Sequence, residues 1–144
     1  MNKNPDKWIR KAVSDRINNM VVSAKIIPCI DTNYTGNTQP FFYVAMSTQT
    51  KEEEDLNKCN GLWNCSLLLD VTTRYLSTGN IGSRVLLDDI EERIIFLMNN
   101  FSVEGGFDLQ KPVTLSPSTS MDGHDDNEVY FRKLMRYNIR LIEQ

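Results

Sequence analysis

The chain has 144 residues, of which 40% are hydrophobic and 24% are charged, and its formal net charge is -3. A chain of this length buries roughly 70% of the surface that its unfolded form would expose. The composition excludes a disordered or fibrous protein, and the small negative charge argues against a generally basic nucleic-acid binder. We therefore expect one globular domain over residues 1–144.

The cysteines and the N-terminal residues indicate which kinds of site the chain can hold and in which compartment it is made. The three cysteines, Cys29, Cys59 and Cys65, form no C-x-x-C pair, and none lies beside the single histidine. This spacing predicts neither a zinc site nor a disulfide framework, and nothing else in the chain indicates a cofactor. The first residues lead into an amphipathic segment rather than a signal peptide, and no apolar run approaches the ~20 residues of a membrane span. We expect a protein made in the cytoplasm, without a membrane partner.

The first predicted element is a helix over residues 5–20. Asn4 is a suitable N-cap, Pro5 fits the first helical position, and Asp6 complements the positive end of the helix dipole. An apolar stripe follows at helical spacing, formed by Trp8, Ile9, Ala12, Val13, Ile17 and Met20. We expect one amphipathic helix that buries this stripe.

Two strands, a turn and a loop are predicted next. Residues 21–30 are β-branched, and Pro28 is typical of an edge strand or a strand end, while 31–39 has the composition of a turn. A strand begins at Pro40 and alternates apolar residues on both faces, so both faces should be covered. Residues 49–61 contain an acidic run and end in Asn-Gly, which predicts a long protruding loop.

The best strand pattern covers residues 62–76. One alternating set is mostly apolar and should face the core: Trp63, Cys65, Leu67, Leu69, Val71, Thr73 and Tyr75. A second helix then starts near Ser83, a plausible N-cap, and ends before Gly105-Gly106. Its buried stripe is predicted to be Leu86, Ile90, Ile94, Leu97, Met98 and Phe101.

Two more strands are predicted after this helix, at residues 113–120 and 128–143. The last segment also fits a helix face, but its β-branched and aromatic content and its alternation favour a strand. The elements together predict an α+β fold, in which a twisted, mostly antiparallel sheet of about five strands packs against two amphipathic helices.

One segment raises the question of a metal or acid-base site. Residues 120–131 hold the chain's only histidine, His124, among four acidic residues, Asp122, Asp125, Asp126 and Glu128. The segment lacks the D-x-[DN]-x-[DN]-G order of a calcium loop, and Asp-Gly and Asp-Asn between two strands are typical of turns. We interpret it as the tip of a hairpin.

No motif of nucleophilic, metal-dependent or phosphate-binding chemistry is present, so the sequence predicts a protein that is not an enzyme. The acidic residues of the second helix, Asp88, Asp89, Glu91 and Glu92, are interpreted as exposed positions. A hydrolase built on the segment from Asp122 to Glu128 is the weakest alternative. It requires metal-dependent activity that is lost when His124 and Asp125 are changed.

Two charged features are candidates for contacts with a partner. Arg132, Arg136 and Arg140, here called the arginine stripe, share one face of the last predicted strand. The stripe is either a solvated face or a contact for an acidic surface or for nucleic acid phosphates. The acidic run consists of Glu52, Glu53, Glu54 and Asp55. It either serves solubility or, in a ring, meets the arginine stripe of the next subunit.

The order of these elements carries a resemblance. A "PFFYVAM" strand, a charged loop, a "WNCSLLLDVTTRYL" strand, a "GNIGSRVLLDDIEERIIFL" helix and a closing hairpin follow one another. This series resembles the tail terminator and tail-completion proteins of tailed bacteriophages, the ring-forming proteins of the head-tail junction. The resemblance covers nearly the whole chain and lies in element order and texture.

The resemblance implies a virion structural protein without catalytic residues or cofactor. It implies a cyclic ring of six or twelve copies around the channel for packaged DNA, with connector, portal-side and tail proteins as neighbours. Residues 47–61 and 116–128 exceed what a minimal member needs and are candidate docking arms. The alternative is a small intracellular nucleic-acid or protein-binding module, which strongly salt-dependent DNA binding would favour.

Overall fold

A computed structural model describes residues 4–31, 41–54, 61–76, 83–124 and 127–144. The helices in these ranges are α1 (Asp6–Ile17) and α2 (Val85–Met98). The strands are β1 (Met20–Val22), β2 (Lys25–Ile27), β3 (Cys29–Ile30), β4 (Phe42–Glu54), β5 (Leu62–Leu76), β6 (Phe107–Leu115), β7 (Thr119–His124) and β8 (Glu128–Glu143).

The main sheet of the described residues has six strands in the order β3-β4-β5-β8-β6, and β7 also pairs with β8. All pairs are antiparallel except β3 with β4, and β1 and β2 form a separate two-stranded hairpin. The predicted α+β class is confirmed. The strand count was too low because residues 20–30 break into three short strands and residues 107–124 into two.

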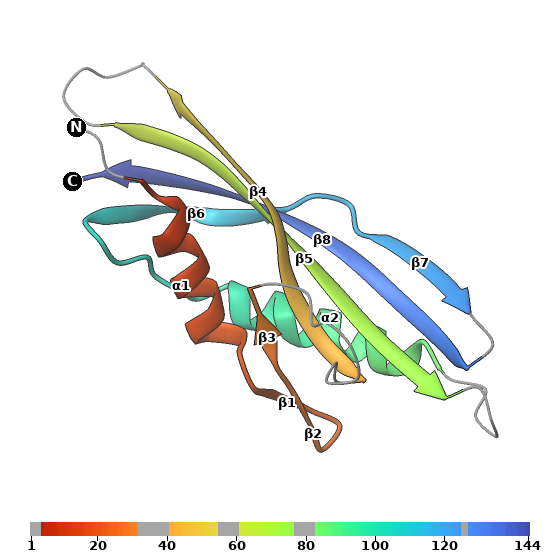
Figure 1. The fold of residues 1–144 in the computed structure, drawn as a ribbon. Coiled ribbons are helices and arrows are strands. Elements are labelled where there is room, and N and C mark those ends of the chain that lie inside the picture. The colour runs from red at the N-terminus through yellow and green to blue at the C-terminus, as the bar shows by residue number, and fades with distance from the viewer. Residues whose placement is uncertain (1–3, 32–40, 55–60, 77–82, 125–126) are drawn as a thin grey trace.

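β8 is the central strand of the fold and settles the ambiguity of the last segment. It pairs with β5 along its length, from Leu62 opposite Ile142 to Leu76 opposite Glu128. Its other edge pairs with β6 at one end and with β7 at the other. Figure 1 shows the long, twisted strands crossing the molecule, with both helices on one side of them. The prediction of a strand over 128–143 is therefore confirmed.

The predicted loop over residues 49–61 is wrong for its first part, because β4 continues to Glu54. A bulge between Met46 and Gln49 shifts the register, and pairing with β5 then runs from Gln49 opposite Leu67 to Glu54 opposite Leu62. The polar residues of this stretch carry no periodic apolar signal. They form a strand because β5 supplies a backbone partner. This pairing cannot be predicted from the composition of residues 49–54 alone.

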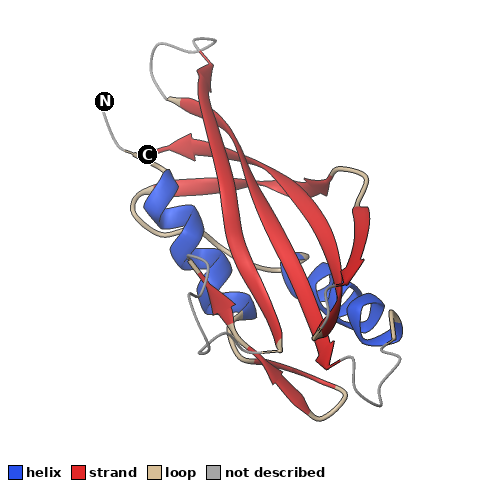
Figure 2. Ribbon diagram, turned by 45° about the vertical axis from the view of Figure 1, so that its right-hand side comes forward, coloured by secondary structure: helices blue, strands red, loops and turns tan. Residues whose placement is uncertain are grey.

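The helices cover one face of the sheet and close the core. The centres of the predicted stripes are buried, since Ile9, Val13 and Ile17 of α1 and Ile90 and Ile94 of α2 are each 0% exposed. Trp8 and Ala12 of the first stripe are only partly buried. Figure 2 shows the opposite face of the sheet without a helix. No helix among the described residues is both long enough and apolar enough to cross a membrane.

The first helix is shorter than predicted. It ends at Ile17, because Asn19 adopts a left-handed backbone conformation with φ 60 and Met20 already begins β1. The Asn18 side chain accepts a hydrogen bond from the Cys29 backbone N–H at 2.9 Å. This bond joins the end of α1 to β3, so tertiary contacts set the point where the helix stops.

Both faces of β4 are covered near its start, as predicted. Val44 and Met46 face the helices, whereas Tyr43 and Ala45 lie on the opposite face and are only 6% and 3% exposed. On the neighbouring β5 the predicted core set is confirmed, since Cys65, Leu67, Leu69 and Val71 are buried and Trp63 packs against them. The alternation of the sequence thus maps directly onto the two faces of the sheet.

Candidate interaction surfaces

The arginine stripe lies where the sequence predicts it, on the sheet face opposite the helices. Along β8, Met135, Tyr137, Ile139 and Leu141 are buried and face the core, and the arginines occupy the alternate positions. Their contacts differ from one end of the strand to the other. The three residues are therefore not equivalent, although they share one face.

Arg132 is neutralised within the chain by Asp70 of β5. Its Nε donates to Asp70 Oδ1 at 3.2 Å, and its Nη2 donates to Asp70 Oδ2. This two-bond contact is the geometry in which a guanidinium fits a carboxylate. The hydrogen bond with Asp70 raises the pKa of Arg132 above its usual value, although burial opposes the shift. Arg132 is thus engaged with its own sheet rather than open to a partner.

The other two arginines contact neutral side chains. Arg136 donates to Ser66 Oγ at 2.8 Å and to Thr48 Oγ1, and it has no carboxylate at ion-pair distance among the described residues. Arg140 Nε donates to Asn64 Oδ1 at 3.0 Å. The hydroxyl groups of Ser66 and Thr48 therefore hold the Arg136 guanidinium group without cancelling its charge.

The acidic run does not form a separate loop. Glu52 lies opposite Asn64, and Asn64 lies opposite Arg140, so Glu52 and Arg140 flank one residue in the same cross-strand row. Glu53 lies opposite Trp63, on the other face of the sheet, and Glu54 ends β4. Asp55 is outside the described residues. The fold thus brings acidic and basic candidates together within one chain, which sequence spacing alone does not reveal.

The histidine segment forms the predicted hairpin between β7 and β8, with His124 opposite Val129. Two of its carboxylates have separate partners: Asp122 contacts Arg84, and Glu128 accepts hydrogen bonds from Arg74 of β5 at 2.8 and 2.9 Å. Asp125 and Asp126 are outside the described residues. Within the described part of the chain, no three His, Cys, Asp or Glu residues are grouped so that they could hold a metal ion.

The sequence reasoning missed two buried charged residues, Lys133 and Glu143. Lys133 is the one that joins a helix to the sheet. It lies on the core face of β8, is only 9% exposed, and donates to Asp88 at 2.8 Å and to Glu91 at 3.4 Å. Burial lowers the pKa of Lys133, but the hydrogen bond with Asp88 and the charge of Glu91 outweigh it, so the pKa is raised. Asp88 is exposed, as predicted, but Glu91 is only partly exposed, and both acidic residues tie α2 to β8.

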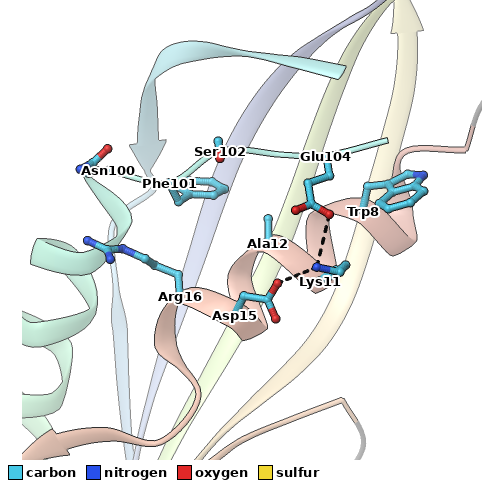
Figure 3. A pocket seen from close by; sticks show the side chains of 9 residues that line it. All are labelled: Trp8, Lys11, Ala12, Asp15, Arg16, Asn100, Phe101, Ser102 and Glu104. Atoms are coloured by element: carbon cyan, nitrogen blue, oxygen red, sulfur yellow. Dashed lines mark hydrogen bonds and ion pairs between the residues drawn. The ribbon is translucent and has the colours of Figure 1, made fainter. Parts of the chain in front are cut away.

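A small cavity lies between α1 and the segment that follows α2. Its volume is about 260 Å³, and it is lined by Trp8, Lys11, Ala12, Asp15, Arg16, Asn100, Phe101, Ser102 and Glu104. Figure 3 shows the residues that line the cavity, with Lys11 between Asp15 and Glu104. Trp8 packs on Gly105, whose φ of +81 and missing Cβ allow this close approach.

Comparisons with known proteins give a likeness in structure but none in sequence. No family model matches the chain, and no curated protein matches it. Among solved structures, the chain is similar to a chain of a structure titled "Virion of native gene transfer agent (GTA) particle", with a TM-score of 0.66 and 9% sequence identity. The match covers 96% of this chain and 99% of that chain. At this identity the likeness establishes a shared fold over nearly the whole of both chains.

Proposed function

We propose that this chain is a structural protein of a phage-like virion particle. In this proposal it forms a ring at the head-tail junction, as a tail terminator or as a neck or connector ring around the DNA channel. The role needs no catalytic residue and no cofactor. The ring contains six or twelve copies and contacts the connector, portal-side and tail proteins that lie next to it.

The observation that carries this proposal is the fold shared with a chain of a virion particle, matched over 96% of this chain and 99% of that chain. The lengths therefore agree as well as the topology. The element order of the sequence also resembles that of structural proteins from phage particles. Because one fold serves many functions, the assembly itself has to be tested.

The edges of the sheet support self-assembly. Among the described residues, β3 covers the outer edge of β4 only at Val44 and Ala45, and β6 and β7 pair with β8 on one side only. Unpaired backbone groups at a sheet edge are places where another chain adds. Two different exposed edges on one molecule provide the head-to-tail contacts from which cyclic assemblies are built.

Native mass spectrometry of the purified chain over a wide concentration range tests the proposal. We expect a closed oligomer of six or twelve copies, visible as a ring with a central channel in electron micrographs. A strict monomer at every concentration would contradict a ring that forms by itself.

A titration of the same protein with duplex DNA tests the binding-module alternative. We expect weak binding, because Asp70 neutralises Arg132 and Glu52 shares a row with Arg140. Strong binding that weakens steeply with salt would instead favour a nucleic-acid-binding module.

A further inference from the structure

One carboxyl group of the core has too few partners. Glu143, at the end of β8, lies on the helix face of the sheet and is only 1% exposed. Its Oε2 accepts one long hydrogen bond, from the Trp63 Nε1–H at 3.4 Å, and its buried Oε1 has no hydrogen-bond partner. Burial of a carboxylate costs free energy unless a cation or hydrogen-bond donors compensate it. Glu143 therefore has the capacity to bind a further group.

A second carboxylate, that of Glu53 on β4, reaches the same place. Gly61 precedes β5, the strand between β4 and β8, and its carbonyl accepts a hydrogen bond from the Glu143 backbone N–H at 2.7 Å. A Cβ atom on Gly61 would lie 2.8 Å from Glu143 Oε2 and 3.4 Å from Glu53 Oε1. The two carboxylates therefore converge over the bare Cα of Gly61. We call Glu53 and Glu143 the carboxylate pair.

The described residues supply no cation to the carboxylate pair, since neither acid takes part in an ion pair with any of them. Lys51, two residues before Glu53 on the same face of β4, is engaged with Asp6 at 3.0 Å and with Asn4 at 2.8 Å. Glu53 is exposed, so its side chain can turn toward a bound group. The pair thus combines a carboxylate held in the core with one that reaches it from solvent.

We propose that the carboxylate pair binds a calcium ion above Gly61. Carboxylate oxygens are the ligands that this ion prefers, and its flexible shell of roughly 6–8 oxygens accepts several water molecules. Because Glu143 is 1% exposed, a lysine or arginine side chain of a partner protein would need more room there than an ion. An ion that reaches Glu143 must also lose water, which calcium does more readily than magnesium.

The composition of the site sets the expected affinity. Among the described residues, no third His, Cys, Asp or Glu joins the carboxylate pair. Water therefore completes the coordination shell, and we expect a Kd of roughly 0.1–1 mM, at the weak end of the range for protein calcium sites. The bound ion joins Glu53 of β4 to Glu143 of β8 across β5, so it stabilises the folded chain.

The first test uses terbium, which replaces calcium in oxygen sites and emits light when an excited tryptophan lies close to it. The chain has two tryptophans, and the Trp63 ring is the one that contacts Glu143. Trp63→Phe is expected to lose most of the terbium emission, whereas Trp8→Phe is expected to keep it. Added calcium should displace the terbium from the wild type. Equal emission from both variants would show that terbium binds elsewhere.

The second test measures binding and stability with calcium itself. With calcium at about ten times the Kd, the melting temperature of the wild type is expected to rise by about 3–8 °C over that in EDTA. Magnesium chloride at the same concentration is expected to give a smaller rise, and it also controls for ionic strength. Isothermal titration calorimetry with calcium chloride gives the Kd directly.

Variants of the same size assign the effect to the carboxylate pair. Glu143→Gln is expected to abolish the calcium-dependent rise, and Glu53→Gln to weaken calcium binding about tenfold, because each removes one charged ligand. Glu53→Gln changes an exposed residue, so it tests the site even if Glu143→Gln folds poorly. Glu52→Gln is the matched control, since Glu52 is an exposed neighbour opposite Asn64, on the other face of the sheet. It is expected to bind calcium as the wild type does.

The site does not depend on the proposed ring, and the outcomes keep the two apart. If calcium leaves the melting temperature of the wild type unchanged, or if both glutamine variants of the pair respond as the wild type does, the calcium site is wrong and the ring is unaffected. If calcium has no effect but Glu143→Gln prevents oligomers from forming, the group that binds Glu143 is a cationic side chain of a second copy, and the calcium site is again wrong.

Discussion

The two faces of the main sheet belong to the same strands but are stabilised in different ways. On the helix face, Leu69, Met135 and Ile139 are completely buried under α1 and α2. On the opposite face, Arg132 and Arg136 are bonded to Asp70 and Ser66 of the neighbouring strand. The first face is held by removal of apolar surface from water, and the second by cross-strand polar contacts.

This difference shows which residues the fold depends on. Buried apolar residues have no substitute partner when they are shortened, whereas a half-exposed arginine exchanges its protein contacts for water. Substitutions on the helix face should therefore destabilise the fold strongly, whereas substitutions in the arginine stripe should have little effect on stability. Lys133 and Glu143 are exceptions, because both are charged residues on the buried face.

The largest expected effect is a core truncation on β5. Leu69→Ala should lower the free energy of unfolding by about 2–5 kcal/mol, because it leaves a cavity under the helices. Leu68→Ala, at the next position on the half-buried outer face, should cost less than about 1.5 kcal/mol. Urea denaturation of both variants measures the difference. Equal losses would mean that the two faces do not differ as described.

Removal of the buried lysine comes next. Lys133→Ala should cost about 1.5–3 kcal/mol, because hydrogen bonds with two charged partners are lost and Glu91 is left partly buried without its cation. Lys133→Met keeps most of the packing and should recover part of the loss. Chemical denaturation, with circular dichroism to follow α2, measures both. If Lys133→Ala leaves the free energy of unfolding unchanged, the contacts of Lys133 with Asp88 and Glu91 contribute nothing to stability.

Alkaline pH should destabilise the protein through buried groups on the helix face. Burial raises the pKa values of Cys29 and Cys65 to about 12. An unfolded thiol ionises at about pH 8.5. The buried thiols therefore make their full contribution to the free energy of unfolding below that pH, and this contribution falls as pH rises toward 12. Each thiol contributes up to about 1.4 kcal/mol per pH unit. Lys133 adds to this loss near its own raised pKa.

Urea midpoints at pH 8 and pH 10 measure this fall. The variant with Cys29→Ala and Cys65→Ala is the control and should show a smaller decrease between the two pH values. A wild type with equal stability at both pH values would contradict the buried, neutral thiols.

The smallest effects are expected within the arginine stripe. Arg132→Ala should cost about 1 kcal/mol, because Asp70 is left mostly buried beside it, while Arg140→Ala should change stability by less than about 0.5 kcal/mol. Thermal unfolding of both variants measures this. If Arg140→Ala loses more stability than Arg132→Ala, the expectation that Arg132 matters more for stability is wrong. The same variants show whether assembly depends on the stripe, as the sequence-based hypothesis requires.

The sequence predicted much of the fold but less of the candidate surfaces. The stripes of α1 and α2 and the alternation of β5 and β8 are repeated signals that report local structure directly. The arginine stripe follows from the same alternation. Its partners do not, because Asp70 and Arg132 are 62 residues apart and meet only through strand pairing. The exposure of Phe96 was also missed, since a single aromatic residue on the outer side of a helical pattern carries no signal of its own.

The sequence by itself determined the fold class, the two helices, and the core faces of the longest strands, because burial selects apolar residues at the period of each element. Only the tertiary structure decided that β4 reaches Glu54, that α1 stops at Ile17, and that Lys133 joins α2 to the sheet. Each of these depends on a partner distant in the chain. Pairing between distant segments is set by the packed whole, and local composition does not record it.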